Sequence, residues 1–150
     1  MSKDKKLDVN PQGAAELPGV KPTKIYISGP MTGLPEHNYP AFFEAEKLLK
    51  KAGFQEIVNP ARLGEQASWE EYMKRDIQLL CQCDGVAFLD GWGDSKGARL
   101  EVQIANALGI TVTSLESWID LEQVRENFRT MIADFLNDEP ADLIKEGSDA

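Results

Sequence analysis

Residues 84–114, DGVAFLDGWGDSKGARLEVQIANALGITVTS, contain in order a strand, a loop, a helix and a second strand. Asp84 to Asp90 is a continuous apolar run of the kind that a parallel sheet buries on both faces. A glycine-containing loop leads into a helix expected from about Lys96 to Leu108, and Gly109 ends it before the strand Ile110 to Ser114. This β-α-β pattern decides the fold class.

The chain repeats the same alternation on the N-terminal side of this unit. The elements expected there are a strand at Lys24 to Ser28, a helix at Asn38 to Ala52, a strand at Glu56 to Asn59 and a helix from a capping box at Ser68–Glu71 to about Cys83. Ser117 is expected to cap a last amphipathic helix that runs to about Leu136. Together these elements predict an α/β, Rossmann-like (flavodoxin-like) fold, in which helices cover both faces of a parallel sheet in three layers.

The length of 150 residues suits one domain with a substantial core. Residues 1–22 combine charges, prolines and glycines with almost no aromatic side chains, so we expect a flexible tail there. The domain is expected at residues 23–137, and the acidic end at residues 138–150 is expected to fray.

Composition limits the partners of the protein. The net charge of −9 repels nucleic-acid polymers and anionic membranes. No apolar stretch approaches the roughly 20 residues that span a bilayer, and residues 1–23 lack the apolar run of a secretory signal. We therefore expect a cytoplasmic protein. Cys81, Cys83 and His37 do not form a recognisable zinc motif, so neither a metal nor a cofactor is expected.

Two carboxylates fall inside apolar helix stripes. Asp76 lies in the stripe of the helix that starts at Ser68, and Glu101 lies in the middle of the stripe formed by Ala98, Ile104, Ala105 and Leu108. Burying an ionised carboxylate costs several kcal/mol unless it is paired or lines a cleft. An ion pair with Arg75 or Arg99 explains Asp76 equally well, whereas the position of Glu101 near the ligand-binding edge of the sheet favours a catalytic role.

The loops after the strands supply the other candidates. The loop from Gly29 to Gly33 could cradle a phosphate or sugar, and Ser95 begins a helix whose free N–H groups at Gly97 and Ala98 could bind an anion or hydroxyl, although a plain helix cap is also common. Trp92 could stack on a base or serve as a hydrophobic lid. Tyr26 is expected in the core with its hydroxyl at the sheet end, Asn59 could simply shape a turn, and His37 is expected on a surface loop.

Three motifs in order carry a family resemblance: Tyr26-Ile-Ser-Gly-Pro-Met-Thr-Gly33, Arg75-Asp76 and Asp94-Ser-Lys-Gly-Ala-Arg-Leu-Glu101. They resemble the nucleoside 2-deoxyribosyltransferase-like superfamily, in particular a small bacterial and phage branch, over roughly residues 24–114. The resemblance implies Glu101 as the nucleophile at the anomeric carbon, supported by Asp76 and Tyr26. The substrate-binding residues that we expect are Ser28, Gly29, Pro30, Met31, Thr32, Gly33, Asn59, Trp92, Ser95, Gly97 and Ala98.

The resemblance implies cleavage or transfer of the N-glycosidic bond of a nucleoside, a deoxynucleoside or a 5′-monophosphate, without a cofactor, by a homo-oligomer. Thr32 stands where the related 2′-deoxynucleoside 5′-monophosphate N-hydrolases carry a basic residue, so a phosphate would lose its main anchor unless Lys96, Arg62 or a partner subunit replaced it. Two alternatives stay open: a module that binds a nucleotide or NAD derivative without turnover, and a scaffold whose acids form internal ion pairs.

Overall fold

Parallel strands form the centre of the structure, which is a computed structural model that describes residues 24–138. Within that range the strands are β1 (Lys24–Ser28), β2 (Glu56–Val58), β3 (Gly85–Phe88) and β4 (Thr111–Ser114), in the sheet order β2-β1-β3-β4. Every neighbouring pair is parallel, and Tyr26 of β1 lies opposite Val58 on one side and Val86 on the other. The chain therefore leaves the central pair, β1 and β3, at the same edge of the sheet.

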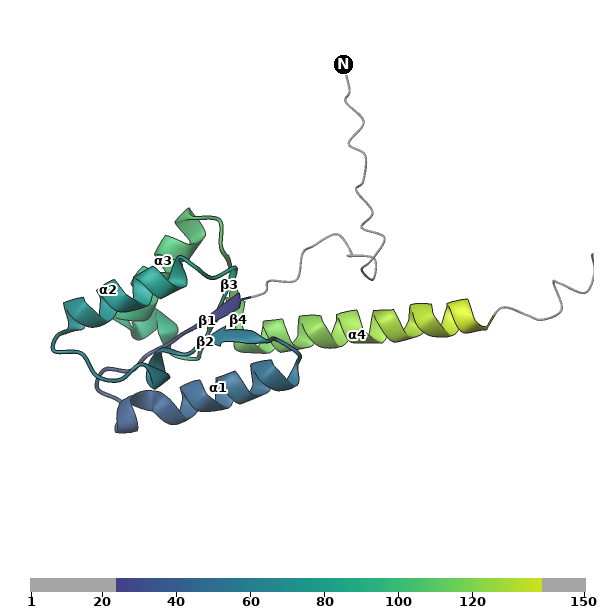
Figure 1. Cartoon of the computed structure of the whole chain (residues 1–150). Coiled ribbons are helices and arrows are strands. Elements are labelled where there is room, and N and C mark those ends of the chain that lie inside the picture. Colours follow the sequence, from purple (N-terminus) through teal and green to yellow (C-terminus); the bar gives the residue numbers. More distant parts are fainter. Residues whose placement is uncertain (1–23, 139–150) are drawn as a thin grey trace, which may run out of the picture.

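Helices cover both faces of this sheet, as Figure 1 shows. The helices are α1 (Tyr39–Lys51), α2 (Trp69–Leu80), α3 (Lys96–Ala107) and α4 (Leu115–Asn137), joined in part by the short 3-10 turns η1 (Pro35–Asn38), η2 (Pro60–Arg62) and η3 (Trp92–Asp94). α1 and α4 lie on one face, and α2 and α3 lie on the other. The three-layer, Rossmann-like α/β fold predicted from the sequence is confirmed.

Alternation along β1 divides the core into two halves. Ile25 and Ile27 are fully buried against α1 and the first turns of α4. Tyr26 is fully buried against α2 and α3. Ser28, two residues beyond Tyr26, points to the same side as Tyr26, and this alternation brings its hydroxyl next to α3.

Two local predictions are wrong. Ser114, not Ser117, caps α4: its hydroxyl accepts from the backbone N–H of Ser117, because the last residue of β4 still has extended backbone when the helix begins. Leu108 was expected to face the core but is 58% exposed, since α3 ends at Ala107 and the chain has already turned away. The predicted tail at residues 1–22 and all but Asp138 of the predicted frayed end lie outside the described residues.

Candidate active site

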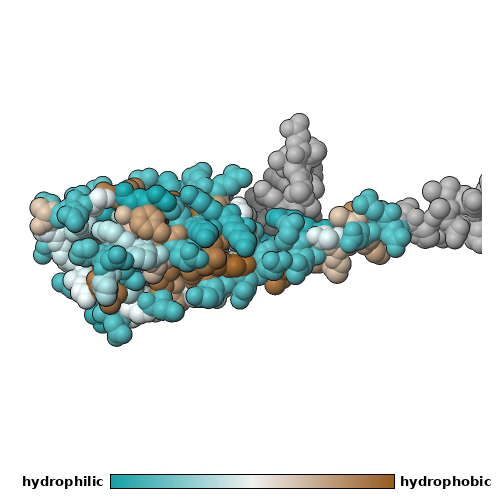
Figure 2. All heavy atoms as spheres, turned by 90° about the horizontal axis from the view of Figure 1, so that it is seen from below, coloured by the Kyte–Doolittle hydropathy of each residue, from teal (hydrophilic) through white to brown (hydrophobic). Residues whose placement is uncertain are grey.

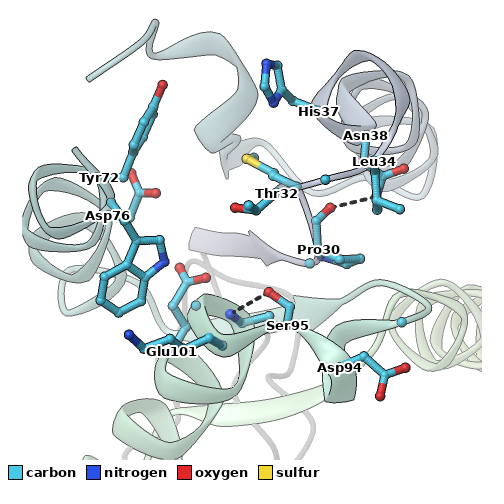
Figure 3. A pocket seen from close by; sticks show the side chains of 18 of the residues that line it. Pro30, Thr32, Leu34, His37, Asn38, Tyr72, Asp76, Asp94, Ser95 and Glu101 are labelled. Carbon is cyan, nitrogen blue, oxygen red and sulfur yellow. Dashed lines mark hydrogen bonds between the residues drawn. The ribbon is translucent and has the colours of Figure 1, made fainter. Parts of the chain in front are cut away.

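A cleft of about 1040 Å³ opens beyond the carboxyl ends of β1 and β3. The chain passes from β1 to α1 on one face and from β3 to α3 on the other, so the two loops diverge and leave a hollow between them. Figure 3 shows this cleft with the loop after β1 facing the first turns of α2 and α3. Of the residues predicted for the site, those that line it are Gly29, Pro30, Met31, Thr32, Gly33, Asp76, Ser95, Gly97, Ala98 and Glu101.

Glu101 reaches the cleft from the second turn of α3 and is only 6% exposed. Its Oε1 accepts a hydrogen bond of 3.2 Å from Ser28 Oγ, whereas its Oε2 has no partner among residues 24–138. Burial raises the pKa of Glu101 to about 8, and the nearby Asp76 carboxylate adds to this, while the Tyr26 and Ser28 hydroxyls oppose it. The result is a carboxyl group with one oxygen hydrogen-bonded and one buried oxygen that lacks a partner among the described residues.

Tyr26 lies behind Glu101 in the core and does not line the cleft. Its hydroxyl faces the Glu101 carboxyl without reaching hydrogen-bond geometry, and it has no other partner among the described residues. Burial raises the pKa of Tyr26 well above its usual value, and the charges of Glu101 and Asp76 add to the effect. Tyr26 therefore stays neutral, and it is placed to support Glu101 from behind, away from a ligand.

Asp76 lines the cleft from α2 and is paired at the same time. Arg75 Nε donates to Asp76 Oδ1 at 2.9 Å, and Arg75 Nη1 donates to the backbone carbonyls of Leu63 and Gly64. Burial raises the pKa of Asp76, and the Arg75 hydrogen bond opposes that rise. Asp76 is thus both ion-paired with Arg75 and part of the cleft lining. The two are compatible because Arg75 does not cover the side of Asp76 that faces the cleft.

The start of α3 forms one wall of the cleft. Ser95 Oγ accepts from the backbone N–H of Ala98 at 3.2 Å, so the predicted helix cap is present. A Cβ atom at Gly97 would lie 3.1 Å from Met73 Sδ, which shows that this glycine lets α3 approach α2 closely. Ser95, Gly97 and Ala98 consequently lie at the surface of the cleft close to Glu101.

The opposite wall is the loop after β1. At Gly29 a Cβ would lie 3.0 Å from Leu89 Cβ, so a larger residue would push the loop away from β3. Asn38 Nδ2 donates to the backbone carbonyl of Pro30 at 2.9 Å and ties the loop to the start of α1. Glu36, His37 and Asn38 adopt left-handed backbone with φ of 52°, 52° and 57°. Side chains other than glycine rarely adopt this conformation, so the loop is held at the cleft rim at some cost in strain.

Two predicted site residues point elsewhere. Asn59 is buried: its Oδ1 accepts from the N–H of Ala61, and its Nδ2 donates to the carbonyl of Phe42. It joins η2 to α1 and does not line the cleft. Trp92 packs on Phe88 with ring centroids 5.0 Å apart and is also absent from the lining. Asn59 thus has the turn-shaping role considered above, and Trp92 serves apolar packing.

A family model for a domain of unknown function, DUF4406, matches residues 23–114. The match includes all four strands named above and every residue that lines the cleft. The chain belongs to the DUF4406 family. No curated protein matches it. α4 begins at Leu115, immediately after the matched range, although its first turns complete the core of the DUF4406 domain.

Two aromatic side chains of α2 that were not among the predicted site residues line the cleft of the DUF4406 domain. Trp69 and Tyr72 are half-buried on the same helical face as Asp76, and both border the cleft. The ammonium group of Lys96 lies 4.0 Å from the centroid of the Trp69 ring. Tyr72 lies four residues and Trp69 seven residues before Asp76, so both share its helical face, and this spacing was the available signal. His37, expected on a surface loop, is exposed but also lies at the rim.

The lining of this cleft is predominantly acidic. Its carboxylates are Glu70, Asp76, Asp90, Asp94 and Glu101, and its basic side chains are Lys96 and His37. Within residues 24–138, no group of three or more potential ligands from His, Cys, Asp and Glu comes together in a way that could hold a metal ion. In the same range, no helix has the length and apolar character needed to cross a membrane.

Proposed function

We propose that the DUF4406 domain of this chain cleaves or transfers the N-glycosidic bond of a nucleoside or deoxynucleoside, with Glu101 as the nucleophile. One observation carries the proposal: a buried carboxyl group faces a cleft large enough for a nucleoside, and its Oε2 lacks a partner among the described residues. The three sequence motifs shared with the nucleoside 2-deoxyribosyltransferase-like superfamily support the same role, since they contribute Glu101, Asp76 and most of the lining.

The chemistry needs one carboxylate to attack and one acid to assist departure of the base. Glu101 Oε2 forms a bond to C1′, and the C1′–N bond breaks with its electron pair going to the base nitrogen. Asp76, whose pKa is raised, gives a proton to that nitrogen. Water, or the nitrogen of a second base, then loses a proton to Asp76 and attacks C1′, which releases Glu101.

Glu101 must be ionised for this attack. With a pKa of about 8, about a tenth of the free protein carries the ionised form at pH 7. The oxocarbenium character that develops on the sugar favours that form in the transition state, since opposite charges attract strongly in a buried site. Ser28 assists by holding Oε1, which limits the rotation of the carboxyl group and leaves Oε2 without a competing partner among the described residues.

The charge of the lining favours an uncharged nucleoside over its 5′-monophosphate. Acidic side chains outnumber basic ones around the cleft, and the loop after β1 carries Thr32 where a cation would be useful. Lys96 is the nearest cation to the start of α3, but it lies over the Trp69 ring. Trp69 and Tyr72 offer aromatic surfaces for stacking a base.

A second candidate is a module that binds a nucleotide or NAD derivative without turnover. The raised pKa of Glu101 favours it to some extent, because a protonated carboxyl can donate a hydrogen bond to a ligand but cannot attack. For either candidate we propose a cytoplasmic location, since Cys81 and Cys83 are both free thiols, as is usual in a reducing compartment.

The test is incubation of the purified protein with mixed nucleosides, deoxynucleosides and their 5′-monophosphates, with free base and new nucleosides measured by mass spectrometry. We expect base release that Glu101→Ala abolishes while circular dichroism shows a retained fold. Glu44→Gln, which alters an exposed carboxylate of α1, serves as the matched control and should keep full activity. Binding without any free base would favour the second candidate, and neither binding nor turnover would overturn both.

A further inference from the structure

α4 extends well past the rest of the described fold, as Figure 1 shows. Its first turns are anchored: Trp118 is 2% exposed, donates from Nε1 to the carbonyl of Val86 at 2.9 Å, and meets Phe54 edge-on. Glu122 is also buried. From Glu126 onwards every described residue of the helix is exposed. The rest of the described domain therefore does not bury the second half of α4.

Large apolar side chains follow one side of this projecting helix. We call them the α4 stripe: Leu121, Val124, Phe128, Met131, Ile132, Phe135 and Leu136, all of which are exposed. Val124 is 63% exposed and Phe135 is 77% exposed. Figure 2 shows brown side chains along the narrow projection beside the polar ones. An exposed apolar surface of this length on a soluble domain usually marks a binding surface.

The α4 stripe is not a continuation of the core-facing side. Leu115, Trp118 and Glu122 pack toward the sheet. At 3.6 residues per turn, the stripe centred on Val124 and Phe128 lies about a third of a turn away from them. Except for Leu136, which lies five full turns after Trp118, the stripe would therefore stay uncovered even if the domain extended further along the helix. Its partner is to be sought outside the described fold.

The spacing of the stripe is that of a coiled coil. Leu121, Val124, Phe128, Met131 and Phe135 alternate at intervals of three and four residues, which are the a and d positions of a heptad. Such a seam is self-complementary, because the side chains of one helix fit between the equivalent side chains of an identical helix. Arg125, at the edge of the stripe, donates to Glu122 at 3.1 Å, so its charge is compensated within the chain.

We infer that α4 pairs with α4 of a second copy of this chain through the α4 stripe, to make a homodimer. The area is sufficient: apolar side chains of this size and exposure offer on the order of 100 Å² each, so pairing two stripes removes roughly 1,400 Å² from water, within the range of stable interfaces. The inference does not depend on the proposed reaction.

A lipid surface fits the stripe less well than a second copy. The exposed surface of α4 carries the acids Glu116, Asp120, Glu126 and Asp134, whereas its bases are Arg125 and Arg129. Helices that lie on anionic membranes have basic polar faces, whereas this polar face would be repelled. The acidic face is compatible with a coiled-coil dimer, whose outer surfaces remain in water.

The test is the molar mass of the full chain in solution by light scattering. We expect twice the chain mass of 16.6 kDa at micromolar concentration. Val124→Glu with Met131→Glu should give a monomer and raise the dissociation constant at least about 100-fold, because each dimer would bury four unpaired carboxylates. Gln123→Glu with Thr130→Glu adds the same charge on the other side of α4 and should leave the dimer intact.

Circular dichroism and the fluorescence of buried Trp118 check that both double variants stay folded. A wild-type chain that stays monomeric at about 100 μM, where even weak coiled coils assemble, overturns the inference. A dimer that the stripe variant leaves intact also overturns it. Sedimentation of the wild type with phosphatidylserine vesicles, lost in the stripe variant, would assign the stripe to lipid instead.

Discussion

Ser28 and Glu101 are 73 residues apart in the sequence and meet just beneath the cleft, where the buried Ser28 Oγ donates to Glu101 Oε1 at 3.2 Å. One residue ends β1 and the other lies in the second turn of α3. The hydrogen bond fixes one carboxyl oxygen and leaves the other without a partner among the described residues. The parallel sheet is what makes this possible, because it brings the end of its first strand beside the helix that follows its third.

The buried carboxyl predicts how stability changes with pH. The pKa of Glu101 is raised from 4.5 to about 8 in the folded protein, so between these values the folded state holds a proton that the unfolded state has lost. The free energy of unfolding therefore falls as pH rises from about 4.5 to 8 and levels off above that range. The contribution of Glu101 to this fall is on the order of 3–5 kcal/mol.

Urea unfolding of the wild type and of Glu101→Gln across this pH range measures that contribution. The difference between them isolates Glu101, because Asp76 and Glu46 titrate in both proteins. We expect Glu101→Gln to gain stability over the wild type progressively with rising pH. Parallel curves for the two proteins would show that Glu101 is solvated and is not the buried acid described here.

The Ser28 hydroxyl predicts a shift in the pH dependence of turnover. Its hydrogen bond lowers the pKa of Glu101, so Ser28→Ala should move the acid limb of the kcat/KM profile from near pH 8 to higher pH. At neutral pH we expect about a tenfold loss of kcat/KM for base release, as for the removal of one charge-assisted hydrogen bond. Activity should recover in part at pH 9.

Ser114→Ala is the matched control for Ser28→Ala. Ser114 caps α4 with its hydroxyl and lies outside the cleft lining, so its loss should lower stability but leave the pH profile unchanged. A Ser28→Ala profile that falls uniformly at every pH would mean that Ser28 affects the site without acting on the ionisation of Glu101.

Particular residues show how far the sequence could predict this site. Glu101 and Asp76 were predicted because a carboxylate inside an apolar stripe stands out against the helical period. Trp69 lines the cleft although it was not among the predicted site residues, whereas Trp92, for which stacking on a base and an apolar lid were both open, does not line it. The helical period alone does not distinguish core from cleft at the first turn of a helix. The side on which Trp92 lies depends on the short turn η3 and on its contact with Phe88, neither of which has a sequence signature.

The left-handed backbone at the cleft rim could not be predicted from the sequence either. Glu36, His37 and Asn38 all have positive φ without a glycine among them. Asn38 and His37 are residue types that favour this region but Glu36 is not, so local preference gives no warning of a run of three. The hydrogen bond from Asn38 to Pro30 holds the conformation, and that contact exists only in the folded loop.

The acidic lining predicts a change of substrate preference on adding a cation. Thr32 is exposed at the rim, in the loop after β1. Thr32→Arg should lower the KM for a nucleoside 5′-monophosphate about tenfold through a charge-assisted contact, with little change for the uncharged nucleoside. Thr32→Gln, of similar length but neutral, is the control. Equal changes for both substrates would place the sugar's 5′ position away from this loop.

Packing around Gly85 predicts a coupling between two positions in the core. A Cβ at Gly85 would lie 2.8 Å from Ile25 Cδ1 and 2.9 Å from Trp118 Cζ2. The Ile25 methyl can shift, but the Trp118 ring is held by its hydrogen bond to the Val86 carbonyl. Gly85→Ala should therefore lower the free energy of unfolding by about 2 kcal/mol or more, as overpacking does.

Trp118→Phe removes both the clashing ring atoms and the hydrogen bond, at a cost of about 1–3 kcal/mol by itself. In the double variant, alanine at position 85 occupies part of the space that the indole left. The double variant should therefore lose less stability than the two single variants lose together, by about 1 kcal/mol or more. Urea unfolding of the wild type, the two single variants and the double variant measures this double-mutant cycle. Strictly additive values would show that the strand β3 yields at Gly85 without pressing on α4.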